Sequence, residues 1–188
     1  MIIGITGKKQ SGKDTMANYL VKEYGFIKYS MAGPLKEGCK KLFGLTEEQV
    51  NGDFKETIDK RWGVTPRKIL QVMGTEIFQY DLLERIPEFK SIGRRFWVLR
   101  FKQFCDDNPY ANIVISDIRF LHESQAISQL CGKMVRIVRP SAFSTDLHPS
   151  EMEQEKIQTC FTFVNDGTFK DYYKLIDHFM KNGAFNGF

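Results

Sequence analysis

Nine residues near the start of the chain, Gly7 to Thr15 (GKKQSGKDT), have the composition of a loop that binds a phosphate group. They follow a short apolar run, residues 1–6, and precede an amphipathic helical pattern. Glycines at both ends let backbone N–H groups turn toward an anion. The helix that follows adds unpaired N–H groups and the positive end of its dipole. Lys13 supplies a full charge that can reach a transferable phosphate, so the order of strand, loop and helix predicts a P-loop.

The loop departs from the usual P-loop at the position after its lysine. A serine or threonine normally stands there and binds Mg²⁺ through its hydroxyl, whereas this chain has Asp14, with Thr15 one residue later. A carboxylate is also a good Mg²⁺ ligand. We therefore expect Mg²⁺ to be held by Asp14, by Thr15, or through water by either. The alternative is a glycine-rich turn that binds nothing.

A second candidate site follows the apolar run of residues 113–115, where Ser116 and Asp117 end the pattern. In open α/β sheets, ligands bind at the carboxyl ends of the strands. Asp117 is therefore placed to hold Mg²⁺ through water. Arg119 has the guanidinium fork suited to a substrate phosphate. It could equally be the salt-bridge partner of a nearby acid.

The polar stretch from Arg139 to Gln158 is a third signal. Phosphoryl transfer competes with hydrolysis, and such enzymes close a lid that excludes water. Arg139 lies just past a strand and is expected to reach the transferring phosphates. His148 is either a lid contact or an exposed loop residue.

Strand and helix patterns alternate along the chain and must position these residues. Helical patterns separate the five expected strands, residues 1–6, 26–30, 112–116, 134–138 and 160–164. This alternation predicts an α/β fold of three layers with a five-stranded, mainly parallel sheet.

We expect one domain over residues 1–188, with a core and two additions. The core comprises about residues 1–32, 110–139 and 159–188; a helical insertion spans about 33–109 and a lid about 140–158. Within the insertion, Thr65 and Pro66 begin a helix with Ile69, Met73 and Ile77 on one face. Arg67 and Gln71 share another face. Residues 80–111 give no clear pattern apart from a helical stretch at 96–104.

Composition excludes several classes of protein. The chain has 188 residues, 42% of them hydrophobic, and a net charge of +4 without a basic stripe, so nucleic acid is not an expected partner. The spacing of its four cysteines matches no zinc site. No apolar run is long enough to span a membrane. We expect a soluble cytoplasmic protein.

Several segments together resemble the deoxynucleoside monophosphate kinases of bacteriophages and large DNA viruses. The helical motif from residue 65 to 76 and the stretch Ser116–Phe120 are more specific than the P-loop. The similar segments are Gly7–Thr15, Ala32–Lys36, Thr65–Gln71, Gly74–Glu76, Ser116–Phe120 with Glu123, Arg139–Pro140, His148–Glu151 and Asn165–Thr168.

The resemblance implies transfer of the γ-phosphate from ATP·Mg²⁺ to a deoxynucleoside monophosphate (dNMP). It implies ATP contacts at Gly7, Lys8, Gln10, Ser11, Gly12, Lys13, Asp14, Thr15, Asn165 and Gly167, the last two near the adenine. The implied acceptor contacts are Lys36, Arg67, Gln71, Gly74, Thr75, Asp117, Arg119 and Glu123. Lys13, Arg119 and Arg139 would offset the charge that develops during transfer, and Asp14, Thr15 and Asp117 would hold the metal. The resemblance also implies a possible homodimer and, for a viral source, a location in the host cytoplasm.

Two other readings remain open at this stage. Dephospho-CoA kinases and animal-type phosphomevalonate kinases have related loops, so the acceptor could be one of those phosphorylated molecules. A sensor that binds ATP without turning it over would also need a P-loop. The helical motif at residues 65–76 favours the nucleotide acceptor.

Overall fold

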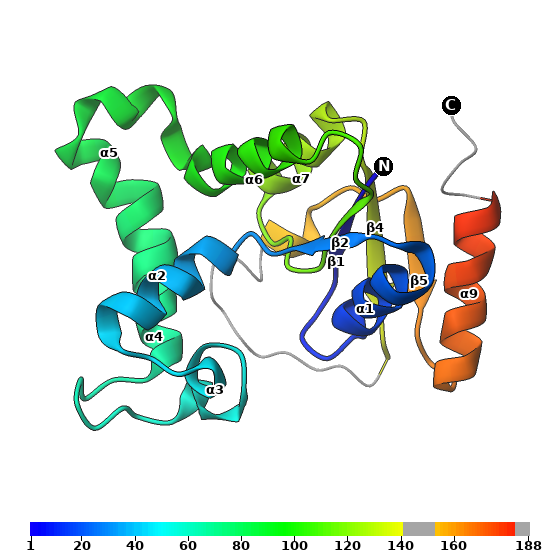
Figure 1. Ribbon diagram of the computed structural model, residues 1–188, viewed down its shortest axis with the longest axis horizontal. Coiled ribbons are helices and arrows are strands. Elements are labelled where there is room, and N and C mark those ends of the chain that lie inside the picture. The colour runs from blue at the N-terminus through cyan, green and yellow to red at the C-terminus, as the bar shows by residue number, and fades with distance from the viewer. Residues whose placement is uncertain (141–152, 183–188) are drawn as a thin grey trace. The chain divides into compact units, whose positions relative to one another are not determined.

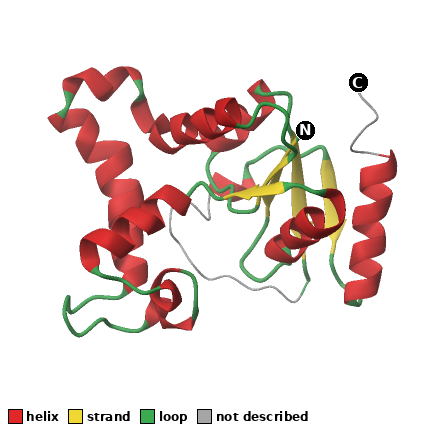
Figure 2. Cartoon of the chain, viewed as in Figure 1, coloured by secondary structure: helices red, strands yellow, loops and turns green. Residues whose placement is uncertain are grey.

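The computed structural model describes residues 1–140 and 153–182, and its chain divides into two compact units (Figure 1). Unit 1 comprises Met1–Ser30 and Phe104–Phe188, and unit 2 comprises Met31–Gln103. Unit 1 carries the sheet, whereas unit 2 is built from helices and loops (Figure 2).

The sheet of unit 1 has five strands in the order β2-β3-β1-β4-β5. Every pairing between neighbours is parallel, which confirms the predicted sheet. Gly4 at the centre of β1 lies opposite Ile115 on one side and Met134 on the other. The strands are β1 (Ile2–Thr6), β2 (Ile27–Tyr29), β3 (Ile113–Ile115), β4 (Lys133–Val138) and β5 (Phe161–Val164).

Helices cover both faces of this sheet, giving the three layers expected from the sequence. Helices α1 (Lys13–Tyr24) and α9 (Phe169–Asn182) share a buried core with Ile3 and Ile5 of β1. Helix α7 (Leu121–Gln129) covers the opposite face, where a Cβ atom added to Gly4 would lie 2.6 Å from Ile127. Because side chains alternate along a strand, β1 contributes to both cores.

Unit 2 has its own hydrophobic core. Its fully buried members are Leu35, Cys39, Leu45, Val50, Ile69, Leu70 and Trp97. Its helical segments are α2 (Gly33–Phe43), α3 (Glu47–Val50), η1 (Asp53–Glu56), α4 (Pro66–Gln71), η2 (Val72–Asp81), α5 (Leu82–Arg85), η3 (Pro87–Ser91) and η4 (Gly93–Arg95). Helix α6 (Phe96–Asp107) carries the chain from unit 2 back into unit 1.

The helix predicted from Pro66 changes its winding at Val72. Segment η2 is a π-helix, whose wider turns alter the angle between successive side chains. Ile69 is buried, and the half-buried Met73 packs against the same core of unit 2, which confirms a shared apolar face for these two residues. Ile77 is half-buried, and its place on that face stays a prediction.

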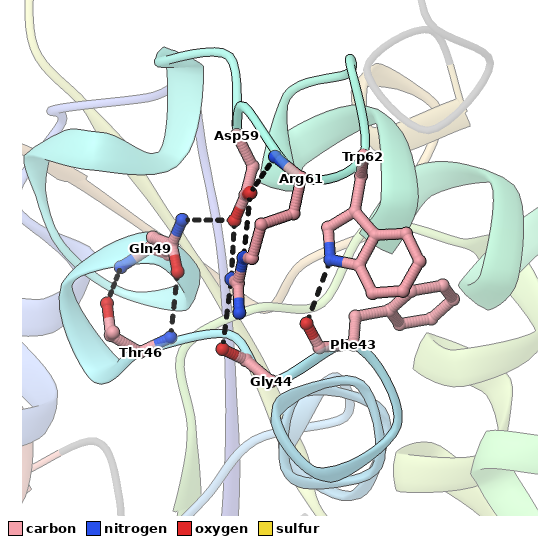
Figure 3. A network of polar contacts seen from close by, with 7 residues as sticks. All are labelled: Phe43, Gly44, Thr46, Gln49, Asp59, Arg61 and Trp62. Carbon is pink, nitrogen blue, oxygen red and sulfur yellow. Dashed lines mark hydrogen bonds and ion pairs between the residues drawn. The ribbon is translucent and has the colours of Figure 1, made fainter.

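A network of polar contacts fastens the loop before α4 to the end of α2 (Figure 3). Asp59 is buried and accepts hydrogen bonds from the backbone and guanidinium of Arg61 and from the amide of Gln49. Arg61 also donates to the carbonyl of Gly44, at 3.1 Å. Arg61 hydrogen bonds hold the pKa of Asp59 well below its usual range. The indole of Trp62 donates to the carbonyl of Phe43, at 2.9 Å.

Hydropathy along the helices bears on membrane association. Within residues 1–140 and 153–182, none of the helices combines the length and apolar character that crossing a bilayer would require.

Candidate active site

The loop between β1 and α1 has a backbone that requires glycine at two positions. Gly7 has φ = 143° and Gly12 has φ = 107°. A Cβ atom on Gly7 would lie 2.3 Å from the carbonyl oxygen of Ile137, and one on Gly12 would lie 2.5 Å from the Asn165 amide nitrogen. Gln10 also has a positive φ, 63°. The spacing of the two glycines therefore reflects close packing as well as backbone conformation.

Lys13 folds back over this loop. Its ammonium donates hydrogen bonds to the carbonyl oxygens of Gly7, at 2.5 Å, and Lys8, at 2.7 Å. The charge is thus held against the loop that would surround a phosphate. Lys8 itself is exposed and lies 3.8 Å from the carboxylate of Glu155.

A pocket of about 450 Å³ opens beside the loop in unit 1. It brings together Lys13, Asp14 and Thr15 with Arg139, which comes from the end of β4. The residues that line it are Gln10, Gly12, Lys13, Asp14, Thr15, Arg139, Asn165, Gly167, Thr168 and Phe169. Seven of the ten ATP contacts implied by the sequence therefore line one pocket, five from the loop together with Asn165 and Gly167.

The other three implied ATP contacts lie in the loop, outside the pocket lining. Gly7, Lys8 and Ser11 do not line the pocket. Gly7 and Ser11 are buried in the loop itself, and the carbonyl of Ser11 accepts a hydrogen bond from Asn165, at 2.9 Å. The pocket is therefore formed by part of the loop and by the two chain segments that follow β4 and β5.

Asp14 has the properties of a Mg²⁺ ligand. Burial would raise the pKa of its carboxyl group, but hydrogen bonds from Lys28 and Ser116 outweigh that effect and hold the pKa below its usual value. Lys28 lies 2.7 Å from the carboxylate, and the Ser116 hydroxyl donates to the same oxygen, at 2.8 Å. The carboxylate is therefore ionised at neutral pH. Thr15 places a hydroxyl in the same pocket.

Asp117 lies at the carboxyl end of β3, next to Ser116. It accepts a hydrogen bond of 2.6 Å from the hydroxyl of Ser30, which follows β2. Residues 1–140 and 153–182 contain no group of three or more acidic, histidine or cysteine side chains that could hold a metal alone. The carboxylates of Asp14 and Asp117 suit Mg²⁺, which typically takes one or two carboxylates and completes its shell with substrate phosphates and water.

Glu123 has an internal role that differs from the expected substrate contact. Its side chain is buried, with 4% exposed, and one carboxylate oxygen accepts from the backbone N–H groups of Arg119, at 2.9 Å, and Phe120, at 3.0 Å. Burial raises the pKa of Glu123 to about 7, and the nearby charge of Asp117 adds to that effect. Glu123 thus fixes the backbone that carries Arg119. A direct contact between Glu123 and substrate stays a prediction.

In unit 2, the predicted acceptor residues already have partners within that unit. Lys36 donates to the side-chain oxygen of Asn51, at 2.7 Å, and Arg67 forms an ion pair with Glu56. Gln71 and Thr75 are half-buried.

Gly74 serves the packing of unit 2. A Cβ atom at this position would lie 2.5 Å from a methyl group of Leu35, so the close approach that needs glycine is made by α2. Its carbonyl accepts hydrogen bonds from the side chains of Gln79 and Trp97. The implied contact between Gly74 and the acceptor stays a prediction.

Most of the predicted lid, including His148, lies outside the described residues. Residues 153–155 are helical and are fastened to unit 1. The buried amide of Gln154 donates to the carbonyl of Gly7, at 3.0 Å, and Arg136 donates to the carbonyl of Ile157, at 2.7 Å. The end of the expected lid segment therefore contacts the P-loop.

Sequence reasoning missed several residues of the site. Lys28 and Ser116 hold Asp14. Ser116 belongs to a segment that the sequence singled out, but nothing in the sequence indicated that either residue contacts Asp14. Phe169 lines the pocket although it is in phase with the buried positions of α9. The signal that could have identified it is its position in the first turn of a helix that begins a few residues after the end of β5.

Comparisons with known proteins identify the family of the chain. A family model described as deoxynucleotide monophosphate kinase matches residues 1–58 and 39–176. A protein of Acanthamoeba polyphaga mimivirus named "Putative deoxynucleotide monophosphate kinase" is 41% identical over 190 residues, covering 98% of this chain and 98% of the relative. The deoxynucleotide monophosphate kinase of Enterobacteria phage T4 is 20% identical, covering 96% of this chain and 98% of the relative.

Among solved structures, the dephospho-CoA kinase from Campylobacter jejuni aligns with a TM-score of 0.49 and 19% identity. The alignment covers 97% of this chain and 96% of that structure.

Proposed function

Because the chain belongs to the deoxynucleotide monophosphate kinase family, we propose that it transfers the γ-phosphate of ATP to a deoxynucleoside monophosphate, giving ADP and the diphosphate. The observation that carries this proposal is the pocket of unit 1, in which Lys13, Asp14 and Thr15 meet Arg139. A phosphate-binding loop, a metal-binding carboxylate and a second cation are the parts that phosphoryl transfer uses.

The donor phosphates would occupy the loop between Gly7 and Thr15. Lys13 would exchange its two carbonyl partners for phosphate oxygens, and Arg139 would add a second positive charge from β4. Asp14 and Thr15 would hold Mg²⁺, with Asp117 acting through water. When bound, the metal neutralises phosphate charge and orients the oxygens for in-line transfer.

The acceptor needs no catalytic base, because its phosphate is already an anion at neutral pH. Positioning and charge neutralisation therefore account for the catalysis that the protein must supply. Arg119 is proposed to bind the acceptor phosphate from unit 1. In unit 2, Arg67 and Lys36 are proposed as further phosphate contacts, and Gln71 as a contact to the base.

The test is ADP release with ATP·Mg²⁺ and each of the four dNMPs, alongside AMP, GMP, CMP and UMP. We expect turnover with one or more dNMPs, and the pattern would give both base and sugar specificity. Failure of every nucleotide while ATP still binds would contradict the proposal. Dephospho-CoA and phosphomevalonate would then be tried as acceptors, and failure with those would indicate a sensor.

A further inference from the structure

Phe169 is an exposed aromatic residue inside the pocket that carries the P-loop. Its side chain is 69% exposed, and it lines the same pocket as Lys13 and Asp14. Isolated apolar residues on a protein surface are common and need no explanation. Phe169 differs because its exposed ring borders a phosphate-binding loop, where a nucleotide also presents a flat aromatic base.

The segment that carries Phe169 is fixed to the P-loop by two side chains. Asn165 donates to the carbonyl of Ser11, at 2.9 Å, and Tyr172 donates to the carbonyl of Gly12, at 3.2 Å. Tyr172 is 2% exposed, so this second contact is part of the core. The ring of Phe169 is therefore carried by a helix whose first turn is held against the loop.

Local hydrogen bonds also stabilise the first turn of α9. Thr168 and Asp171 exchange hydrogen bonds, with the Thr168 hydroxyl donating to the carboxylate at 2.6 Å and the Asp171 N–H donating to that hydroxyl at 3.3 Å. Phe169 lies 6.3 Å from the ring of Tyr173, which in turn stacks on Tyr19 at 4.3 Å. These contacts limit the loss of conformational freedom when a ligand packs on the ring.

Asn165 lines the same pocket, and its amide nitrogen is engaged by the carbonyl of Ser11, beside Gly12. Its contact with ATP stays a prediction. Phe169, four residues later, adds an exposed aromatic face to this end of the pocket.

We infer that Phe169 is the platform on which the base of the phosphate donor stacks. This inference rests on the proposed function, since it assigns a residue to the base of the nucleotide whose phosphates occupy the loop. An aromatic ring accepts the face of any base, so stacking supplies affinity with little selectivity among bases.

The test separates the base from the phosphates by using two ligands. Calorimetry with Mg²⁺ would measure binding of ATP and of inorganic tripolyphosphate to the wild type and to Phe169→Ala. We expect the substitution to weaken ATP binding by about 5- to 50-fold, because one base–aromatic stack is lost. Tripolyphosphate binding should change by less than about twofold, because it has no base to stack.

Two further variants act as controls. Phe169→Trp should keep ATP affinity, and ATP but not tripolyphosphate should quench the emission of the added tryptophan. Tyr110→Ala removes an aromatic ring that is 98% exposed in the same unit but does not line the pocket, and it should leave both affinities unchanged.

Unchanged ATP affinity in Phe169→Ala would overturn the inference while leaving the kinase proposal intact. Equal losses for ATP and tripolyphosphate would also overturn it, since they would indicate general damage to the loop. If wild type bound neither ligand, the proposed function would fail and the assignment of Phe169 would fail with it.

Discussion

The two units hold their polar side chains in different ways. In unit 1, the hydrogen bonds of the site join segments far apart in the chain, such as Asp14 with Ser116 and Asn165 with Ser11. In unit 2, the candidate acceptor residues pair with near neighbours, Lys36 with Asn51 and Arg67 with Glu56. The donor pocket is thus assembled by the fold itself. Under the proposed function, Lys36 and Arg67 would exchange these partners for the acceptor phosphate, so we expect their removal to change acceptor affinity more than the fold.

The largest expected effect comes from removing the ammonium group of Lys13 in unit 1. Lys13→Ala should lower kcat by at least about a hundredfold, because a charged group directed at the transferring phosphate is lost. Rates of ADP release would measure this change. Lys9→Ala, which removes an exposed lysine of the same loop, is the matched control. Turnover of Lys13→Ala close to that of the control would remove the P-loop from the mechanism.

The second prediction concerns how the buried carboxyl group of Glu123, in unit 1, makes stability depend on pH. The folded-state pKa of Glu123 is raised to about 7, so its protonated form stabilises the fold at low pH. That stabilisation is present below the unfolded pKa of about 4.3 and is lost as pH rises through about 7, by on the order of 3 kcal/mol. Glu123→Gln should remove this pH dependence, because an amide does not titrate. The fold should be kept, because the amide oxygen still accepts from both N–H groups.

Chemical denaturation at pH 5 and pH 8 would measure the difference. Glu84→Gln, at an exposed position, controls for loss of a carboxyl group. Equal pH dependence in wild type and Glu123→Gln would show that Glu123 does not titrate in this range.

The corresponding change in unit 2 is Arg67→Ala. We expect the KM for the dNMP to rise by about 10- to 100-fold, because a charged hydrogen bond to the acceptor phosphate is lost. The KM for ATP should stay the same, which kinetics with each substrate varied in turn would show. Lys68→Ala, next in the same helix and exposed, is the control. An equal rise in both KM values would remove the distinction between the units.

The smallest effect concerns the network around Asp59 (Figure 3). The pKa of Asp59 is lower in the folded protein than in the unfolded chain. The ion pair with Arg61 therefore stabilises unit 2 at pH values above the unfolded-state pKa, and this stabilisation is lost as pH falls through the folded-state pKa. Asp59→Asn should lower the melting temperature at pH 7, and the gap to wild type should narrow in acid.

Both tryptophans of the chain, Trp62 and Trp97, lie in unit 2, so their fluorescence follows this unit. Asp53→Asn, at an exposed position of the same loop region, is the control. A melting temperature of Asp59→Asn equal to that of the control would show that the network does not stabilise unit 2.

A feature of the fold or site could be predicted from the sequence where the residues that determine it are close together in the chain. The P-loop was predictable because its glycines, lysine and helix start are adjacent in the chain. The five strands and their parallel pairing followed from alternation with helices. The strand order was not predicted, since it depends on how the crossovers run.

Side-chain roles were harder to predict where partners lie far apart. Gly74 matches a family motif, yet its neighbour Leu35 becomes visible only in three dimensions. Phe169 has the spacing of a core residue, yet its side chain is exposed beside the pocket. The π-helix changed the phase of a correctly predicted helix, because period-based reasoning assumes regular winding.

The position of β1 at the centre of the sheet has a consequence for synthesis on the ribosome. Its partners are β3, beginning at Ile113, and β4, beginning at Lys133, so this apolar strand leaves the ribosome long before either neighbour exists. At about 5–20 residues per second, the wait lasts roughly 5 to 20 s. All of unit 2, residues 31–103, emerges during that interval. The first strand therefore stays without its sheet partners while the whole of unit 2 is synthesised.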